Sequence, residues 1–374
     1  MNDIDEQQRR LIGEALRLLH EEYLQNEPFN DYLDSEEMIR VGSLEFPVSQ
    51  VTFWLDRDAY YNDLNVWLDE TLKEKHASTI KLLKDSKQLA VFFELVDSIS
   101  RNRIIPFVGA GLCKPMEMPL WKEALMELNA EINITSSNEI LQLIDSGDYL
   151  IAAEKLAASS SLKVDSFIRT KYRIHSVKGA LKELPKIANG CVVTTNFDNA
   201  IEKVYEVSGI SFDGHMYGKE EHNFFPRLAK GERCLLKLHG DAQNNRTYIL
   251  TDEQYKRAYG AQIDFKLPLP KALRQIYISS TLLFLGCSLE KDRTLDLFKQ
   301  VKEGEDYEVP LHFAILPKPV EQSKVREKEN LLLSINIQPI WYPDEQHQFV
   351  EDILALLSDV SQKRLNLQET ERKV

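Results

Sequence analysis

The sequence predicts an α/β fold, in which a Rossmann-like, doubly wound parallel sheet follows a mainly helical N-terminal domain. From about residue 103 onward, short apolar runs alternate with amphipathic stretches, as is typical of parallel βαβ units. Several of these runs end in small or polar residues. Residues 1–100 carry 10 Lys and Arg against 21 Asp and Glu, a net charge of −11, so only −2 of the total −13 remains for the rest. This asymmetry predicts two units.

The composition sets the class of protein. With 43% hydrophobic and 28% charged residues, the 374-residue chain is typical of a soluble globular protein. A net charge of −13 makes strong direct nucleic-acid binding unexpected, because that affinity depends on Lys and Arg at phosphates. No apolar run reaches 18 residues, and the acidic start Met1–Glu6 is no signal peptide. We therefore expect a cytoplasmic protein with no membrane contact.

The first predicted domain covers residues 1–98. Helical spacing of apolar residues appears over 5–24 and 77–99, and residues 48–75 mix aromatic with acidic side chains. A small helical domain with a solvated acidic face explains this pattern. The alternative is an assembly or partner-docking domain, because acidic and aromatic surfaces can pair with basic partners.

The second predicted domain covers residues 99–374. The expected strands are Ile104–Val108, Cys191–Thr194, Leu235–Leu238, Leu282–Leu285, Phe313–Leu316 and Ile335–Trp341. The expected helices lie within 120–132, 148–158, 198–207, 252–259, 291–302 and 346–358. In such sheets, ligands bind outside the carboxyl ends of the strands, so residues there are candidates for a site.

The first candidate motif is Gly109-Ala110-Gly111, directly after a predicted strand. Glycines at this place let the backbone approach a pyrophosphate, whose charge the backbone N–H groups can bind. The alternative is a simple tight turn. No Gly-Lys-Ser/Thr follows, so ATP hydrolysis is disfavoured.

The second and third motifs end two other strands. Asn196, within Thr195–Asp198, could bond a ribose hydroxyl or orient a water, or it could cap the next helix. His239 precedes a glycine and could act as a general base near neutral pH, or it could be structural.

The fourth motif is Gly286-Cys287-Ser288, at another strand-to-helix turn. Gly286 and Ser288 could contact the ribose or phosphate of a cofactor. Asp292, a few residues later, could cap the helix that follows.

Together the four motifs resemble the sirtuin superfamily, and specifically the sirtuin-like domains of bacterial antiphage defence. Residues 109–111 are similar to the family's GAG loop, 195–198 to its T-N-[YF]-D motif and 238–240 to its L-H-G motif. The segments 250–255 and 283–288 resemble the defence-type branch. The resemblance covers about residues 100–300 and leaves out 1–95.

The resemblance implies an NAD-binding domain with Asn196 and His239 as the catalytic pair. It also implies that NAD is bound, as substrate, by Gly109, Ala110, Gly111, Cys113, Thr195, Asp198, Gly286, Cys287 and Ser288. Two departures from the family pattern matter. The four cysteines lie far apart, with no C-x-x-C pair, so no zinc module and no other metal are expected. Cys113 stands where the family usually has Ser, and a thiol is a weaker hydrogen-bond partner.

The function implied is an NAD⁺ glycohydrolase that depletes NAD⁺ in abortive-infection defence. A free-standing chain of this kind resembles the sirtuin-like member of pairs with a HerA-type hexameric ATPase, so we expect a homo-oligomer and a possible HerA-type partner. Two alternatives stay open. An NAD-dependent protein deacylase would use the same bond cleavage, although it usually carries the zinc module. A non-catalytic NAD or ADP-ribose sensor would bind without turnover.

Overall fold

The computed structural model describes residues 6–35, 38–133, 137–221, 224–290, 293–304 and 308–367. These residues divide into two compact units. One comprises the chain up to residue 77 together with the described residues from 365 on, and the other is Ser78–Arg364. The units thus divide at residue 77, whereas the charge pattern predicts a boundary after residue 98.

The helices just after residue 77 explain this difference. Helices α5 (Ala77–Asp85) and α6 (Leu89–Ser100) precede the first strand of the large sheet. The Gln88 side chain donates to the carbonyl of Trp341 (2.9 Å) and accepts from its N–H (2.6 Å). This bond pair ties the start of α6 to a strand about 250 residues later.

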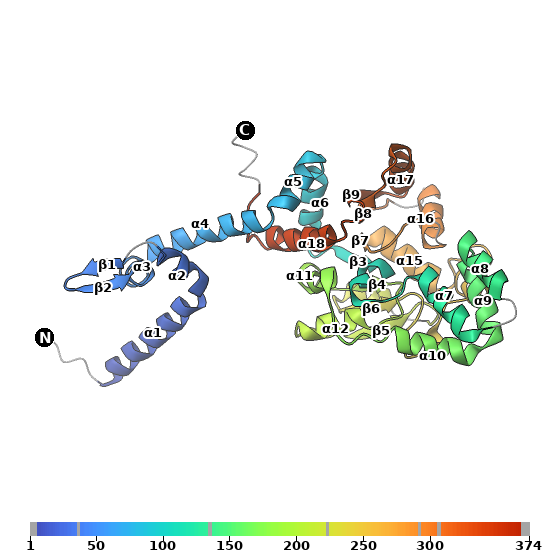
Figure 1. Ribbon diagram of the computed structural model, residues 1–374, viewed down its shortest axis with the longest axis horizontal. Coiled ribbons are helices and arrows are strands. Elements are labelled where there is room, and N and C mark those ends of the chain that lie inside the picture. The colour runs from blue at the N-terminus through green and yellow to red at the C-terminus, as the bar shows by residue number, and fades with distance from the viewer. Residues whose placement is uncertain are drawn as a thin grey trace. The chain divides into compact units, whose positions relative to one another are not determined.

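The larger unit contains a seven-stranded parallel sheet with flanking helices, so the predicted fold class is confirmed (Figure 1). The strands in spatial order are β5 (Gly214–Tyr217), β6 (Cys234–Lys237), β4 (Val192–Thr194), β3 (Ile104–Val108), β7 (Thr281–Leu285), β8 (His312–Lys318) and β9 (Ile337–Pro343). After β3 the chain first builds one side of the sheet and then, with β7, crosses to the other. Strand order therefore reverses beside β3, where such sheets bind ligands.

The central strands are buried along their whole length. Every residue of β3, β4 and β6 is buried, which requires helices on both faces of the sheet. Pro106 lies within β3 and has no N–H to donate. The pairing of β3 with β4 begins one residue later, at Phe107 and Val193, so this proline leaves that ladder intact.

Helices fill the connections between the strands. They are η1 (Ala110–Met116), α7 (Trp121–Ile132), α8 (Ser137–Ser146), α9 (Tyr149–Ser159), α10 (Ser161–Lys171), η2 (Gly179–Glu183), α11 (Leu184–Ile187), α12 (Ala200–Val207), α13 (Phe224–Ala229), η3 (Asn245–Thr247), α14 (Asp252–Tyr259), α15 (Pro268–Ser279), α16 (Arg293–Glu303), α17 (Gln322–Ser334) and α18 (Gln348–Ser361). Residues of α14–α17 pack with the strands in one continuous core.

Helices α7–α10 form a group of their own, inserted between β3 and β4 (Figure 1). Their apolar side chains pack around Leu128, Ile140, Leu156 and Phe167. The same core includes Phe197, from the end of β4. The insertion is therefore anchored on the loop that carries the candidate residue Asn196.

The smaller unit is mainly helical, as expected, and also contains a β-hairpin. Its elements are α1 (Glu6–Gln25), α2 (Glu27–Leu33), β1 (Met38–Val41), β2 (Leu44–Pro47), α3 (Val48–Leu55) and α4 (Arg57–Lys75). Its core is aromatic, because Phe29, Phe53 and Tyr60 are buried against one another. On α1, Leu11 and Leu16 are at least half exposed.

Candidate functional site

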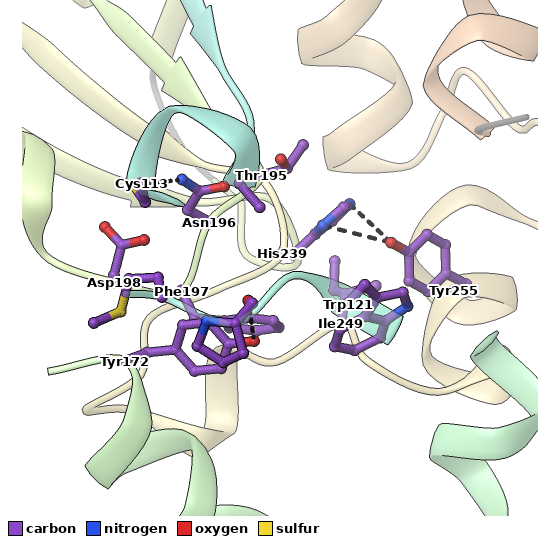
Figure 2. Close-up of a pocket in the computed structure, with 13 residues that line it drawn as sticks. Cys113, Trp121, Tyr172, Thr195, Asn196, Phe197, Asp198, His239, Ile249 and Tyr255 are labelled. Atoms are coloured by element: carbon purple, nitrogen blue, oxygen red, sulfur yellow. Dashed lines mark hydrogen bonds between the residues drawn. The ribbon is translucent and has the colours of Figure 1, made fainter. Parts of the chain in front are cut away.

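A pocket opens at the carboxyl ends of β3, β4 and β6 (Figure 2). Its lining residues are Ala110, Cys113, Met118, Pro119, Trp121, Tyr172, Thr195, Asn196, Phe197, Asp198, His239, Ile249 and Tyr255. The motifs after three separate strands thus meet in one place, because parallel neighbouring strands deliver their following loops to the same edge.

Six of the predicted site residues line this pocket and five do not. Those that line it are Ala110, Cys113, Thr195, Asn196, Asp198 and His239. Those outside its lining are Gly109, Gly111, Gly286, Cys287 and Ser288. All five belong to the loops after β3 and β7, which contact one another beside the pocket.

The glycines of these two loops interlock through backbone. The Gly109 N–H donates to the carbonyl of Leu285 (2.8 Å), and the Gly111 N–H donates to the carbonyl of Gly286 (2.9 Å). A Cβ on Gly109 would lie 2.6 Å from the Gly286 oxygen, and one on Gly286 would lie 2.3 Å from the Leu112 nitrogen. Gly286 also has φ +66°, a conformation that favours glycine. Loop packing alone therefore requires these glycines.

The loop after β7 is also held by Lys328, on α17. The Ser288 and Leu289 carbonyls accept hydrogen bonds from Lys328 Nζ, at 2.5 and 2.6 Å. Cys287 Sγ lies 3.6 Å from the carbonyl oxygens of Phe107 and Leu285. Asp292, the predicted helix cap, lies outside the described residues.

Asn196 is held at the pocket by both its backbone and its side chain. Its N–H donates to Thr194 Oγ1 (3.0 Å), and its Nδ2 donates to Cys113 Sγ (3.2 Å). Asn196 does not cap the next helix, α12, whose N-cap residue is Asn199, and Asp198 Oδ1 accepts from the Ala200 N–H (2.9 Å). Asn196 Oδ1 is buried and has no hydrogen-bond partner among the described residues. A buried acceptor left in this state is costly, so it is suited to a ligand hydroxyl or a water.

Cys113 and Asp198 line the same pocket as Asn196 and interact with each other. Burial raises the pKa of the Cys113 thiol well above its ordinary value, and the charge of Asp198 raises it further. The thiol is therefore protonated at neutral pH and serves as a hydrogen-bond partner rather than a nucleophile. Burial also raises the pKa of the Asp198 carboxyl, which Lys237 partly counteracts.

His239 faces the pocket from the end of β6 and is half-buried. Tyr255 Oη lies 3.0 Å from the His239 Nε2 and 3.4 Å from its Nδ1 (Figure 2). The centres of the two rings are 5.2 Å apart. Tyr255 comes from α14, whose start is fixed by a capping box between Thr251 and Gln254. One helix therefore presents a hydroxyl to the imidazole.

The aromatic wall of the pocket was not predicted from the sequence. Trp121 and Tyr172 come from the α7–α10 region, and Phe197 follows Asn196. Tyr172 and Phe197 pack with their ring centres 6.0 Å apart. Phe197 could have been found, because it lies next to Asn196 in the sequence. Nothing in the local sequence shows that Tyr172 reaches the same pocket.

Comparison with known proteins finds a family model that is similar to part of this chain. Residues 190–340 match the model of a family described as the SIR2-like domain. This span runs from β4 through most of β9 and includes Asn196 and His239.

Two relatives are similar over more of the chain. Defense-associated sirtuin 2 of Bacillus subtilis is 22% identical over 301 residues, which is 77% of this chain and 28% of that protein. NAD(+) hydrolase ThsA of Bacillus cereus (strain MSX-D12) is 25% identical over 217 residues, 57% of this chain and 42% of that protein. The chain thus spans less than half the length of either relative.

The structure also bears on membrane spans and metal sites. In the parts of the chain that the structure describes, no helix is long and apolar enough to cross a membrane. Across those same ranges, no three or more His, Cys, Asp or Glu side chains are gathered so that they could hold a metal ion.

Proposed function

We propose that this protein is an NAD⁺ glycohydrolase of the sirtuin-like antiphage defence family, which cleaves NAD⁺ into nicotinamide and ADP-ribose. The observation that carries the proposal is the pairing of two groups in one pocket. Asn196 presents a buried acceptor oxygen without a partner among the described residues, and His239 faces the same space. The SIR2-like match and the two relatives, one of them named as an NAD(+) hydrolase, support it.

Cleavage of the bond between nicotinamide and ribose passes through an oxocarbenium-like transition state, as in other glycosidic cleavage. Nicotinamide leaves as a neutral molecule, so no acid is needed to protonate it. Asn196 Oδ1 would accept a hydrogen bond from a ribose hydroxyl or from the attacking water. His239 would accept the proton that this hydroxyl or water gives up.

The rest of the pocket would bind and shield the substrate. Ala110, Cys113, Thr195 and Asp198 would line the ribose end, and the backbone of the interlocked glycine loops beside the pocket would lie close to the diphosphate. The aromatic wall would keep bulk water away from the reacting carbon, which strengthens every polar contact there.

The defence role extends this proposal to the whole protein. An enzyme that depletes NAD⁺ in the cytoplasm must stay inactive until infection, as abortive-infection defence requires. We assign residues 1–98 to assembly or partner docking, with a homo-oligomer and a HerA-type ATPase as the expected assembly. Supporting this assignment are the net charge of −11 over residues 1–100 and the exposed leucines of α1.

The test is nicotinamide release from NAD⁺ by the full chain, alone and with its partner present. Asn196→Ala and His239→Ala should each lower the rate about 10²–10⁴-fold, the usual contribution of a general acid–base group. The matched controls are Asn138→Ala and His175→Ala, which change exposed residues outside the pocket and should keep the wild-type rate.

Wild-type rates in both site variants would contradict the assignment. NAD⁺ binding without turnover, alone and with the partner, would favour the sensor. Formation of acyl-ADP-ribose from an acylated peptide would favour the deacylase.

A further inference from the structure

Lys237 is a charged side chain buried inside the larger unit. It is the last residue of β6 and has 0% of its surface exposed. Its Nζ donates to the Asp198 carbonyl (2.6 Å), to Asp241 Oδ2 (2.7 Å) and to Glu202 Oε1 (3.0 Å). These three short bonds use all three protons of an ammonium group.

The charged state of Lys237 follows from these neighbours. Burial by itself lowers the pKa of an amine, but the carboxylates of Glu202 and Asp241 outweigh it and raise the pKa of Lys237. The side chain is therefore an ammonium at every pH at which the protein would work. A neutral replacement would leave two partly buried carboxylates without their cation.

The partners of Lys237 lie on both sides of the candidate site. The carbonyls of Phe197 (3.4 Å) and Asp198 belong to the two residues directly after Asn196. Asp241 lies two residues after His239 in the other loop. Glu202 lies on α12, outside the pocket lining. One ammonium thus joins the loop of Asn196 to the loop of His239, and a third contact anchors it to a helix.

Backbone hydrogen bonds also join the two loops, at positions before and after Asn196 and His239. The Leu238 N–H donates to the carbonyl of Thr194 (2.8 Å), and the Ala242 N–H donates to the carbonyl of Phe197 (2.8 Å). These bonds fix the two ends of the contact between the loops. Lys237 adds a side-chain contact between the same two loops, through the Asp198 carbonyl and the Asp241 carboxylate.

We propose that Lys237 is a positioning residue for the reaction: through Asp241 and the carbonyls after Asn196, its ammonium fixes the distance between Asn196 and His239. The inference rests on the proposed function for its kinetic consequence, but its geometric consequence holds without turnover. With a purely structural role, loss of either carboxylate partner would lower stability and leave activity per folded molecule unchanged. A positioning role makes only Asp241 important for activity, since Glu202 carries no loop of the site.

The matched pair of variants is Asp241→Asn and Glu202→Gln. Each removes one negative charge from the same ammonium and keeps the side-chain size. We expect Asp241→Asn to lower kcat for nicotinamide release by about 10²-fold, the order of loss for a misplaced catalytic group, with little change in KM. Glu202→Gln should lower thermal stability while kcat per folded molecule stays close to wild type. Equal kcat values in the two variants, whether both are reduced or both stay close to wild type, would overturn the proposal.

A second measurement does not depend on activity. Hydrogen–deuterium exchange of the full chain should show faster amide exchange at residues 195–199 and 238–243 in Lys237→Met and Asp241→Asn, with other segments unchanged. Unchanged exchange in both loops would overturn the proposal whether or not the wild type releases nicotinamide. If the wild type is inactive but these loops loosen, the proposed function fails and the positioning role stands. If Lys237→Met does not fold, the milder Asp241→Asn decides.

Discussion

At the scale of single residues, Cys113 shows how a departure from a family pattern is accommodated. Where the resemblance predicts serine, the structure places a thiol in contact with Asn196 Nδ2 at 3.2 Å. The thiol is 1% exposed, and its raised pKa keeps it protonated. The substitution therefore preserves a partner for the Asn196 amide.

A prediction follows for this contact. Cys113→Ala should reduce nicotinamide release, because the buried Asn196 amide loses its partner, at a cost of about 1–3 kcal/mol. Cys113→Ser should stay close to wild type, since a hydroxyl can accept the same hydrogen bond. The measurements are kcat and thermal unfolding for both variants. Equal kcat and equal thermal stability in the alanine and serine variants would show that this hydrogen bond contributes to neither.

The candidate site could be predicted from the sequence only in part. Asn196 and His239 each follow a buried apolar run, and the rule that parallel strands share a carboxyl edge predicts that they are close. Trp121 and Tyr172 could not be placed, because their position depends on how α7–α10 pack on Phe197. Lys237 could not be singled out, since nothing local in the sequence shows that its ammonium is buried.

At the scale of elements, β7 and β8 are joined by a side chain as well as by their ladder. His312, at the start of β8, is fully buried, and its Nδ1 accepts from the Leu282 N–H at 3.1 Å. Its Nε2 has no hydrogen-bond partner in the described ranges. Burial lowers the pKa of His312 to about 3. The folded protein therefore keeps this imidazole neutral well below pH 6.5.

This histidine should make stability depend on pH. In the unfolded chain it binds a proton below about pH 6.5, whereas in the folded chain it does so only near pH 3. The unfolded state then holds more protons, so the free energy of unfolding falls as pH falls through this window. His312→Asn, whose side-chain oxygen can accept from Leu282, should show a shallower fall in urea titrations between pH 7 and 5. Identical slopes would contradict the assignment.

Most strands of the large sheet were predicted from the sequence, whereas strand β5 and helix α15 were not. The apolar strands β3, β4, β6, β7, β8 and β9 were all found, β3 with the predicted ends and the others with ends shifted by at most two residues. Strand β5, Gly-His-Met-Tyr, was missed, because it is short, lies at the sheet edge and has only one buried residue. Helix α15 was missed because Pro268 and Pro270 resemble a turn, although proline is tolerated in the first helical turn.

At the scale of the whole molecule, each compact unit has its own core. The smaller unit packs around aromatic side chains and the larger around the sheet and the α7–α10 group. A unit with its own core can fold alone. The charge asymmetry predicts a boundary near residue 100, whereas the compact units divide at residue 77, before most of α5 and all of α6.

We expect residues 78–364, expressed alone, to show a cooperative thermal transition and to keep the pocket. The reason is that the sheet, its helices and the lining residues all lie within this range. Circular dichroism melts against the full chain are the measurement. A fragment that melts without cooperativity would show that the division at residue 77 is not a folding boundary.

The backbone contact between Gly109, Gly111 and Gly286 has a consequence for how this sequence can change. Each loop occupies the space that a side chain on the other would need. A library randomised at these positions and selected only for a folded product would therefore return glycine, with no nucleotide present. The packing of the two loops therefore requires glycine at these positions, whether or not a ligand also requires it.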